Sequence, residues 1–137
     1  SEIFDKKKLE KSIILNLDIL ESSVFLNKAD KFVQYPFPSE INYSSVSDIE
    51  VVKKEKKITQ LVFGGNQFGV KPQFGRYDAS KGWILNIEME NDSIIYSNLT
   101  PLNIEGQIRK FEKFQRNNKN HIAVGINNEK VEFIEIK

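Results

Sequence analysis

The chain has 137 residues, no cysteine, one histidine and a net charge of +1. A chain of this length forms one domain with a hydrophobic core of its own. The absence of cysteine excludes disulfides, thiolate catalysis and cysteine-based zinc sites. The balanced charge provides no basic surface for nucleic acid, and no apolar run approaches the roughly 20 residues that span a bilayer. Because neither a Met nor a signal-like segment opens the sequence, we expect a mature or trimmed piece of a protein.

A helix is expected only at the start of the chain. Residues 1–11 place Ile3, Phe4 and Leu9 loosely on one face, and Asp5 can cap the lysine-rich turn that follows. From residue 12 onward the apolar residues alternate with polar ones, which is typical of strands. We expect roughly nine short strands, joined mostly by hairpins. They are drawn from ten alternating stretches, residues 12–20, 23–27, 31–37, 46–52, 57–63, 82–90, 93–98, 104–115, 121–126 and 131–136.

Turn residues separate these strands. The sequences NDS, RNNKN and NNEK each lie between two alternating stretches, and Asn127 with Asn128 tolerates the positive φ of a tight primed turn. No low-complexity linker interrupts the series. Residues 1–137 are therefore expected to form a single all-β unit of antiparallel hairpins with one short N-terminal helix. The strand spacing fits a sandwich, a barrel or propeller blades equally well.

The stretch GGNQFGVKPQFGRYDAS, residues 64–80, holds four of the seven glycines. A phosphate loop requires a helix after its glycines, whereas Pro72 and a strand-like stretch follow here. A calcium loop requires closely spaced oxygen ligands, but Asn66 and Asp78 are twelve residues apart and the preceding hairpin carries four lysines. The sequence therefore favours neither an anion loop nor a metal site, and no cofactor is predicted.

A structural corner explains more of this stretch. Gly64, Gly65 and Gly69 permit backbone conformations that other residues avoid, and Gly75 and Gly82 bracket the Arg-Tyr-Asp triplet. Arg76 and Asp78 lie on one side of an extended segment, with Tyr77 on the other. A buried Arg76 could hydrogen-bond loop carbonyls and Asp78. A ligand-facing role for these three side chains stays open, since loops often carry binding residues.

The same residues carry a resemblance. The sequence LVFGGNQFGVKPQFGRYDASKGWIL is similar to a corner of VCBS/FG-GAP repeat proteins of Bacteroidetes, in which a strand leads into Gly-Asn, Phe-Gly, Val-Lys-Pro and Gly-Arg-Tyr-Asp-Ala-Ser. Residues 2–38 and 126–137 resemble the flanking segments of that family more weakly. The resemblance implies β-propeller blades, often on exported surface proteins, and it names no reaction.

The chain also departs from that family. An Asp-x-Asp-Gly-Asp-Gly calcium loop often precedes the family's Gly-Asn, whereas this chain has VKKEKKITQ at that place. Calcium is therefore not carried over. The length fits two to three four-stranded blades, fewer than the four to eight of a closed propeller. We accordingly expect the C-terminal part of a larger propeller, with an independent small domain as the alternative.

Catalytic signals are weak. His121 is the only histidine and begins an expected strand, and no Gly-x-Ser-x-Gly elbow is present. Paired carboxylates hydrolyse glycosides when they face one cleft, and the nearest candidates are Asp78, Glu88, Glu90 and Glu105. Phe68, Phe74 and Tyr77 lie in the loop, where a sugar or a partner could stack on them, although core packing is the default for aromatic residues.

The sequence thus predicts a non-enzymatic binding or scaffolding module of an exported, cell-surface or periplasmic propeller protein. Its expected partner is another protein or the rest of its own propeller, with a glycan as a further candidate ligand. The alternative is an accessory or catalytic part of a glycan-active hydrolase that uses Asp78 with a nearby Glu. The residues predicted for the corner and for ligand contact are Gly65, Asn66, Phe68, Gly69, Lys71, Pro72, Gly75, Arg76, Tyr77 and Asp78.

Overall fold

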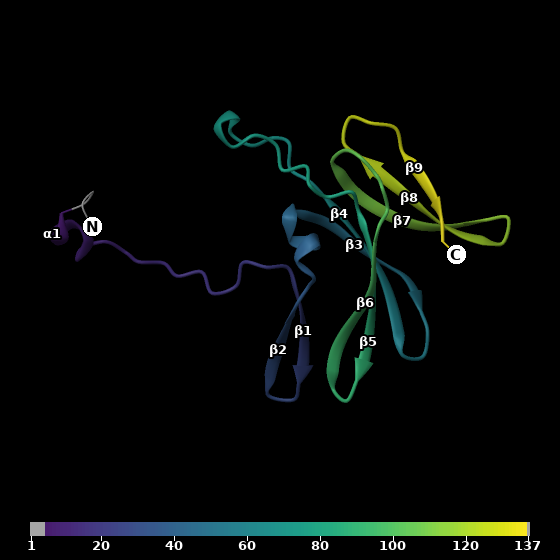
Figure 1. Ribbon diagram of the computed structural model, residues 1–137, viewed down its shortest axis with the longest axis horizontal. Coiled ribbons are helices and arrows are strands. Elements are labelled where there is room, and N and C mark those ends of the chain that lie inside the picture. The colour runs from purple at the N-terminus through teal and green to yellow at the C-terminus, as the bar shows by residue number, and fades with distance from the viewer. Residues whose placement is uncertain (1–4, 137) are drawn as a thin grey trace.

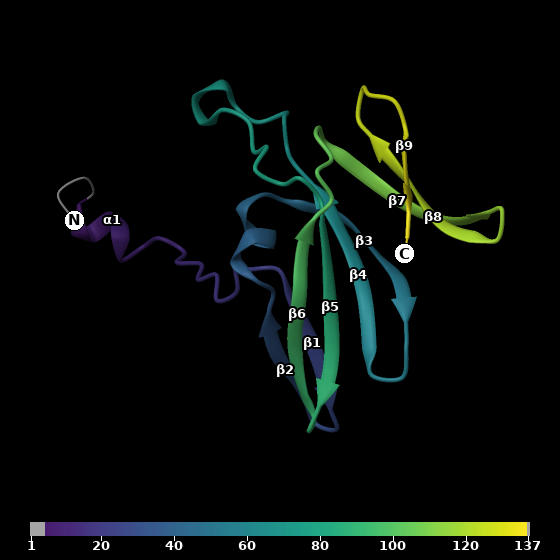
Figure 2. The same cartoon turned by 45° about the vertical axis from the view of Figure 1, so that its right-hand side comes forward.

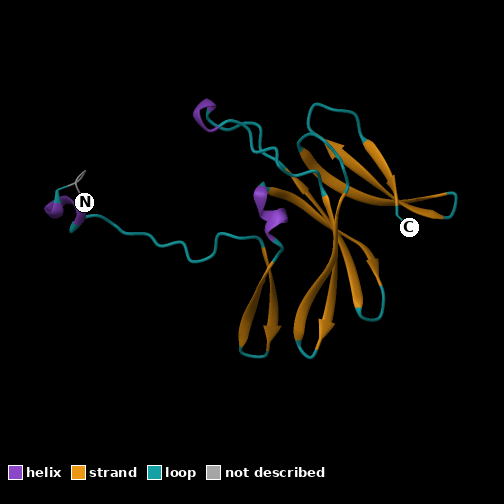
Figure 3. Cartoon of the chain, in the orientation of Figure 1, coloured by secondary structure: helices purple, strands orange, loops and turns teal. Residues whose placement is uncertain are grey.

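The computed structural model describes residues 5–136 and is built almost wholly of antiparallel strands (Figures 1 and 3). This confirms the all-β class expected from the hairpin pattern. The elements in chain order are α1 (Lys6–Leu9), β1 (Ser23–Lys28), β2 (Lys31–Pro36), η1 (Ser39–Tyr43), β3 (Val46–Lys54), β4 (Ile58–Gly65), η2 (Pro72–Phe74), β5 (Trp83–Glu90), β6 (Ser93–Pro101), β7 (Ile108–Arg116), β8 (Lys119–Ile126) and β9 (Glu132–Glu135).

The short helix α1 begins where the sequence predicted a cap. The Asp5 side chain accepts a hydrogen bond from the backbone N–H of Lys7 at 3.2 Å. The helix is a single turn without a buried residue, because no apolar partner packs on it. Ile3 and Phe4, which were expected on its apolar face, lie outside the described residues.

The strands form three antiparallel sheets. We call them the first hairpin (β1-β2), the middle sheet (β3-β4-β5-β6) and the third sheet (β7-β8-β9). Two of the hairpin turns take the left-handed backbone that their residues favour: Asn91 and Asp92 have φ of 47° and 59°, and Asn117 and Asn118 have φ of 53° and 59°. These two turns join β5 to β6 and β7 to β8.

The sheets are stacked in three layers because both faces of the middle sheet are apolar. Leu61, Phe63 and Leu85 point to one face, where they form a buried cluster with Phe37 and Ile41 at the end of the first hairpin. On the other face, Val52 and Val62 pack against buried residues of the third sheet, which are Ile108, Phe111, Ile122, Val124 and Ile126. Figures 1 and 2 show the middle sheet between the other two.

This open stack has no closed barrel in the described part of the chain and is consistent with a partial propeller. Its two outer layers expose aromatic side chains. Phe25 and Phe32 are exposed on the first hairpin, and Phe133 is exposed on β9. Phe133 packs edge-on against Phe114 of the same sheet, with ring centroids 5.7 Å apart. Exposed apolar side chains on both outer layers are expected in a stack of sheets to which further layers can be added.

Polar side chains tie the layers together. The carboxylate of Asp48 on β3 accepts a 2.7 Å hydrogen bond from the backbone N–H of Phe111 on β7, and Lys110 lies 3.1 Å from it. On the other face, the Tyr96 hydroxyl donates to the carbonyl of Tyr35 at 2.8 Å. Burial, and next the proximity of Tyr35, raise the pKa of Tyr96 to about 12.

The structure contradicts one expected strand. Residues 12–20 alternate in polarity as a strand does, yet they are extended, exposed and outside every sheet (Figure 3). A strand requires a neighbour to pair its backbone groups, and no sheet edge lies beside this segment in the described part of the chain. Alternation in the sequence reports the capacity to form a strand, whereas pairing depends on the fold.

Candidate functional site

A projecting arm, residues 66–82, leaves the middle sheet between β4 and β5 and is tipped by η2 (Figures 1 and 3). It contains most of the stretch that the sequence analysis singled out. The two glycines at the end of β4, just before the arm, are Gly64 and Gly65, and they are required by close packing rather than by unusual dihedral angles. A Cβ at Gly65 would overlap the carbonyl oxygen of Ser45, and one at Gly64 would lie 2.6 Å from Ile108. The expectation of special backbone angles is therefore wrong at these two positions, and it is wrong at Gly69 as well, because none of the three has a positive φ.

Asn66 fastens the base of the arm. Its side chain is 1% exposed, and Nδ2 donates to the carbonyls of Ser80 and Gly106, both at 2.8 Å. Its Oδ1 accepts from the backbone N–H of Ser80 at 3.0 Å. The residue has a φ of 98°, which asparagine tolerates better than most residues. One side chain thus joins both ends of the arm to the connection that precedes β7.

The arm is also paired along its base. Gln67 and Tyr77 exchange two backbone hydrogen bonds of 2.8 and 2.9 Å, and the Ser44 hydroxyl donates to the carbonyl of Tyr77 at 3.1 Å. Gln107, which is buried, donates to the carbonyl of Asn66 at 3.3 Å and accepts from the Asn127 side chain at 2.9 Å. The base of the arm is therefore braced from the residues before β3, from the connection before β7 and from the end of β8.

Sequence reasoning did not find the roles of Gln107 and Asn127. Each lies 40 or more residues from Asn66 in the sequence, and the turn motif that includes Asn127 gives no indication of a contact with Gln107 or the arm. A single glutamine or asparagine between strands has many uses, so only the fold reveals its partner. The residue types of Gln107 and Asn127 therefore did not indicate that they brace the arm.

The tip of the arm is open to solvent. Phe74 and Tyr77 are 66% and 47% exposed. Pro72 begins the 3₁₀ turn η2, Lys71 precedes it, and Gly75 ends it with a φ of 71°, which glycine adopts without strain. Gly69 is exposed and lies in open space, where an added Cβ would meet only the Gln67 side chain, at 3.8 Å. The arm therefore presents two rings that do not pack into the core, Phe74 at its tip and Tyr77 beside its base.

Arg76 and Asp78 are not placed as a buried pair. Arg76 is exposed, and its guanidinium lies over the ring of Phe68, 5.0 Å from the centroid. Within the described part of the chain, Asp78 makes neither a hydrogen bond nor an ion pair. The buried arginine fork expected from the sequence is therefore wrong, because the arm projects into solvent and has no interior in which a guanidinium could be enclosed.

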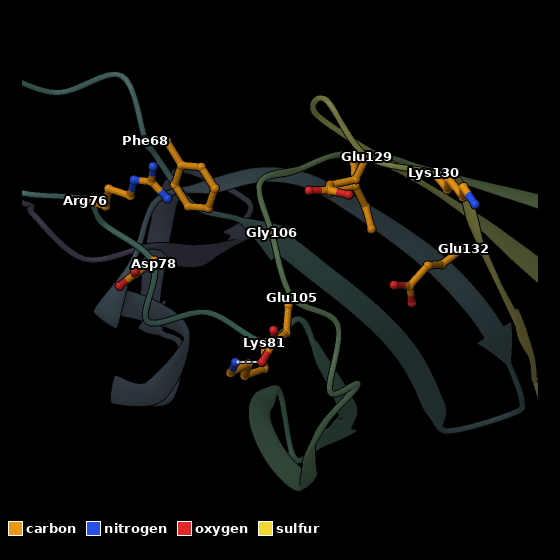
Figure 4. Close-up of a pocket in the computed structure, with 10 residues that line it drawn as sticks. Phe68, Arg76, Asp78, Lys81, Glu105, Gly106, Glu129, Lys130 and Glu132 are labelled. Carbon is orange, nitrogen blue, oxygen red and sulfur yellow. Dashed lines mark hydrogen bonds and ion pairs between the residues drawn. The ribbon is translucent and has the colours of Figure 1, made fainter.

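A cleft of about 570 Å³ lies between the arm and the third sheet (Figure 4). It joins side chains from the arm, from the connection before β7 and from the turn between β8 and β9. The charged residues that line it are Arg76, Asp78, Lys81, Glu105, Glu129, Lys130 and Glu132. A second cleft of about 560 Å³ shares Phe68, Arg76 and Glu129 with the first and adds Arg109 and the amides of Gln67, Gln107, Asn127 and Asn128. The two clefts are polar, of mixed charge, and divided by the stacked Phe68 and Arg76.

The carboxylates considered for glycoside chemistry are differently placed. Asp78 and Glu105 line the same cleft, whereas Glu88 lies on β5 and accepts a hydrogen bond from Ser97 at 3.0 Å. Glu105 forms an ion pair of 2.7 Å with Lys81, drawn as a dashed line in Figure 4. Hydrogen bonding and charge attraction from Lys81 lower the pKa of Glu105 below its ordinary 4.5. A general acid for glycoside hydrolysis requires the opposite shift.

His121 lies on β8 and stacks on Phe114, with ring centroids 5.3 Å apart. Its Nδ1 is 3.1 Å from the carbonyl oxygen of Lys119. Among the described residues, no three side chains of His, Asp or Glu cluster in a way that would hold a metal ion.

Comparison with family models, with curated proteins and with solved structures gave no match to this chain. The resemblance to VCBS/FG-GAP repeats therefore stays a prediction. Over residues 5–136, no helix is long and apolar enough to cross a membrane.

Proposed function

We propose that the chain is a non-enzymatic binding or scaffolding module in which the arm contacts the partner. The observation that supports this is the contrast between the base of the arm and its tip. The three hydrogen bonds of one buried asparagine fix the base, while the rings of Phe74 at the tip and of Tyr77 beside the base stay exposed. Aromatic rings held in place before binding lose little conformational freedom when a partner covers them.

The partner that fits this surface best is another protein, or further sheets of the same propeller. The exposed rings of the arm supply apolar contact, and the charged cleft beside the arm supplies a polar rim of both signs. The family resemblance implies a location at the cell surface or in the periplasm of an exporting bacterium, and this location is part of the proposal.

A glycan-directed role is the second candidate. It is favoured by the presence of Asp78 and Glu105 in one cleft, beside Phe68 and the amide groups of the neighbouring cleft. Sugars are bound by aromatic faces together with amide and carboxylate groups. In this role the chain would be an accessory domain or part of a hydrolase.

The test is a double variant, Phe74→Ser with Tyr77→Ser, compared with Phe25→Ser with Phe32→Ser. Both pairs remove exposed rings, but the second pair lies on the first hairpin, away from the arm. Binding is measured against an array of polysaccharides and against separated cell-envelope proteins. We expect the arm variant to lose at least about tenfold in affinity and the control to keep it. Equal binding by both variants would contradict the proposal.

The variant Asp78→Asn distinguishes the hydrolase alternative from the non-enzymatic role. Because the Asp78 carboxylate makes no hydrogen bond or ion pair with the described residues, the variant is expected to fold like the parent chain. Release of reducing sugar by the parent chain that disappears in Asp78→Asn would establish the enzyme and overturn the non-enzymatic proposal.

A further inference from the structure

The N-terminal segment, residues 13–20, is an apolar strand without a sheet. Six of its eight residues are aliphatic, and their exposed fractions run from 42% at Ile19 to 89% at Ile13. In an extended chain, Ile13, Leu15, Leu17 and Ile19 share one face, while the other face holds the polar Asn16 and Asp18 between Ile14 and Leu20. The backbone groups of residues 13–19 make no hydrogen bond to the described part of the chain. Exposed apolar strands of this kind pair with a sheet edge when one is accessible.

A matching sheet edge is present at β9. The strand order places β9 at the border of the third sheet, and no further strand follows it in the described part of the chain. Beside it lies a groove of about 260 Å³, whose apolar lining consists of Val52, Val62, Ile84, Leu102, Ile122, Ile134 and Ile136. These side chains belong to the same buried cluster that joins the middle and third sheets, or pack against it. The groove is thus a strip of the core that the three-stranded third sheet leaves uncovered, opposite the four-stranded middle sheet.

Residues 13–20 cannot all lie along this groove within their own chain. Ser22 is fixed to the first hairpin, since its N–H donates to the Asn42 side chain at 2.7 Å and its carbonyl accepts from Phe37 at 3.0 Å. The first hairpin and the third sheet lie on opposite faces of the middle sheet, which puts them about 20 Å apart. Leu20 is two residues from Ser22 and so at most about 7 Å away. Only the first residues of the segment are far enough from Ser22 to span that distance, so a strand made of all eight residues on β9 comes from another molecule.

We infer that residues 13–20 of one copy form a fourth strand on β9 of a second copy. Because β9 has four residues and the groove is about 260 Å³, Leu15 and Leu17 enter the groove and Ile13 and Ile19 lie at its ends. Ile14, Asn16, Asp18 and Leu20 lie on the side of Phe133. Backbone pairing with β9 supplies the hydrogen bonds that the segment lacks. The contact joins different surfaces on the two copies. Two chains that exchange their segments form a closed dimer, whereas one-way donation from each copy to the next forms an open chain of copies. It does not involve the arm and is independent of the proposed function.

The first experiment measures the molar mass of the full chain by light scattering across a concentration series. We expect assemblies of two or more copies above the 15.9 kDa of one chain. Leu15→Glu with Leu17→Glu places two charges in the groove and is expected to weaken assembly at least about a hundredfold. Ser12→Glu with Asn16→Glu adds the same charge on the solvent face and should assemble like the parent chain.

The second experiment uses the absence of cysteine. A copy carrying Phe133→Cys is mixed with a copy carrying one cysteine at residue 15, 16, 17 or 18, and the mixture is oxidised. Neighbouring residues on paired strands share a face, so Asn16→Cys and Asp18→Cys should form the mixed disulfide and Leu15→Cys and Leu17→Cys should not.

Two results would overturn the inference. One is a folded monomer at every concentration, including the case in which residues 13–20 become protected from hydrogen exchange by folding onto their own first hairpin. The other is an assembly that the groove-facing variant (Leu15→Glu with Leu17→Glu) and the solvent-facing variant (Ser12→Glu with Asn16→Glu) weaken equally. That result would assign the contact to the exposed rings of the outer layers. The Phe74→Ser with Tyr77→Ser variant should assemble normally, and this separates the inference from the function proposed for the arm.

Discussion

Asn66 offers the sharpest test of how the arm is held. In Asn66→Ala, the side chain that donates to Ser80 and Gly106 and accepts from Ser80 is lost from a site that is 1% exposed. The backbone groups it satisfied stay in place, and those that remain buried are left without a partner. In addition, alanine must adopt the φ of 98° that asparagine holds there.

The size of the effect follows from these contacts. Each buried neutral hydrogen bond contributes about 1 kcal/mol net, and stranded buried partners raise the loss further. A left-handed backbone costs alanine about 1 kcal/mol. The free energy of unfolding should therefore fall by about 4 kcal/mol. Asn66→Asp should lose more, because a carboxylate would face the carbonyl oxygens of Ser80 and Gly106 without a proton to donate.

Asn98→Ala is the matched control. Asn98 has a φ of 53° but its side chain is exposed and makes no hydrogen bond to the described part of the chain. The variant Asn98→Ala should therefore lose only the cost of placing alanine in a left-handed backbone, about 1 kcal/mol of the free energy of unfolding. The assay is urea unfolding followed by circular dichroism, with the midpoint and slope fitted for each variant. If Asn66→Ala and Asn98→Ala differ by less than about 0.5 kcal/mol, the side chain of Asn66 does not hold the arm.

Three further outcomes are expected. Gly65→Ala should lower the free energy of unfolding by more than about 3 kcal/mol, because the new methyl group meets the backbone of Ser45. In the same urea unfolding assay, Gly69→Ala should change the free energy of unfolding by less than about 0.5 kcal/mol, because position 69 lies in open space. Since the folded pKa of Tyr96 is raised from 10 to about 12, its contribution to stability is complete below pH 10 and is lost as the pH rises towards 12. Absorbance titration should show one of the four tyrosines ionising late, and Tyr96→Phe should remove that step; a single step near pH 10 would contradict the burial of its hydroxyl. The folded pKa of Glu105 is lowered, so its contribution is present above pH 4.5 and lost as the pH falls. A carboxyl titration by NMR should give a midpoint below 4.5 that returns towards 4.5 in Lys81→Gln, and an unchanged midpoint would mean that the ion pair does not form in solution.

The sequence predicted the hairpins well because their signals are local. Alternating residues and Asn-rich turns identify β5 to β8 without any knowledge of the partner strand. The same reasoning failed for residues 12–20, whose alternation is as clear, because pairing is a property of the whole fold. For the arm, the sequence marked Gly65 and Asn66 but not their reasons. A glycine next to Ser45 and an asparagine bonded to Gly106 are contacts across 20 and 40 residues of chain.

The candidate site was predicted only in part, because its loop has local signals in the sequence but its long-range contacts do not. Phe74 and Tyr77 stand in a loop that the sequence identified, and exposure at its tip follows from the turn residues around them. The stacking of Arg76 on Phe68, in place of a buried pair with Asp78, depends on the direction in which the arm leaves the sheet. That direction is set by the bracing from Gln107 and Asn127, residues that no local pattern connects to the arm.

The claim that the arm is a braced unit holding exposed rings is tested most directly by hydrogen exchange of its backbone amides. The amides of Gln67 and Tyr77 bond each other's carbonyls, so we predict protection comparable with that of β4 and β5, and its loss in Asn66→Ala. Residues 70–75 at the tip should exchange rapidly in both proteins. Exchange of Gln67 and Tyr77 as fast as that of the tip would show that the arm is not fixed at its base, and would contradict the account.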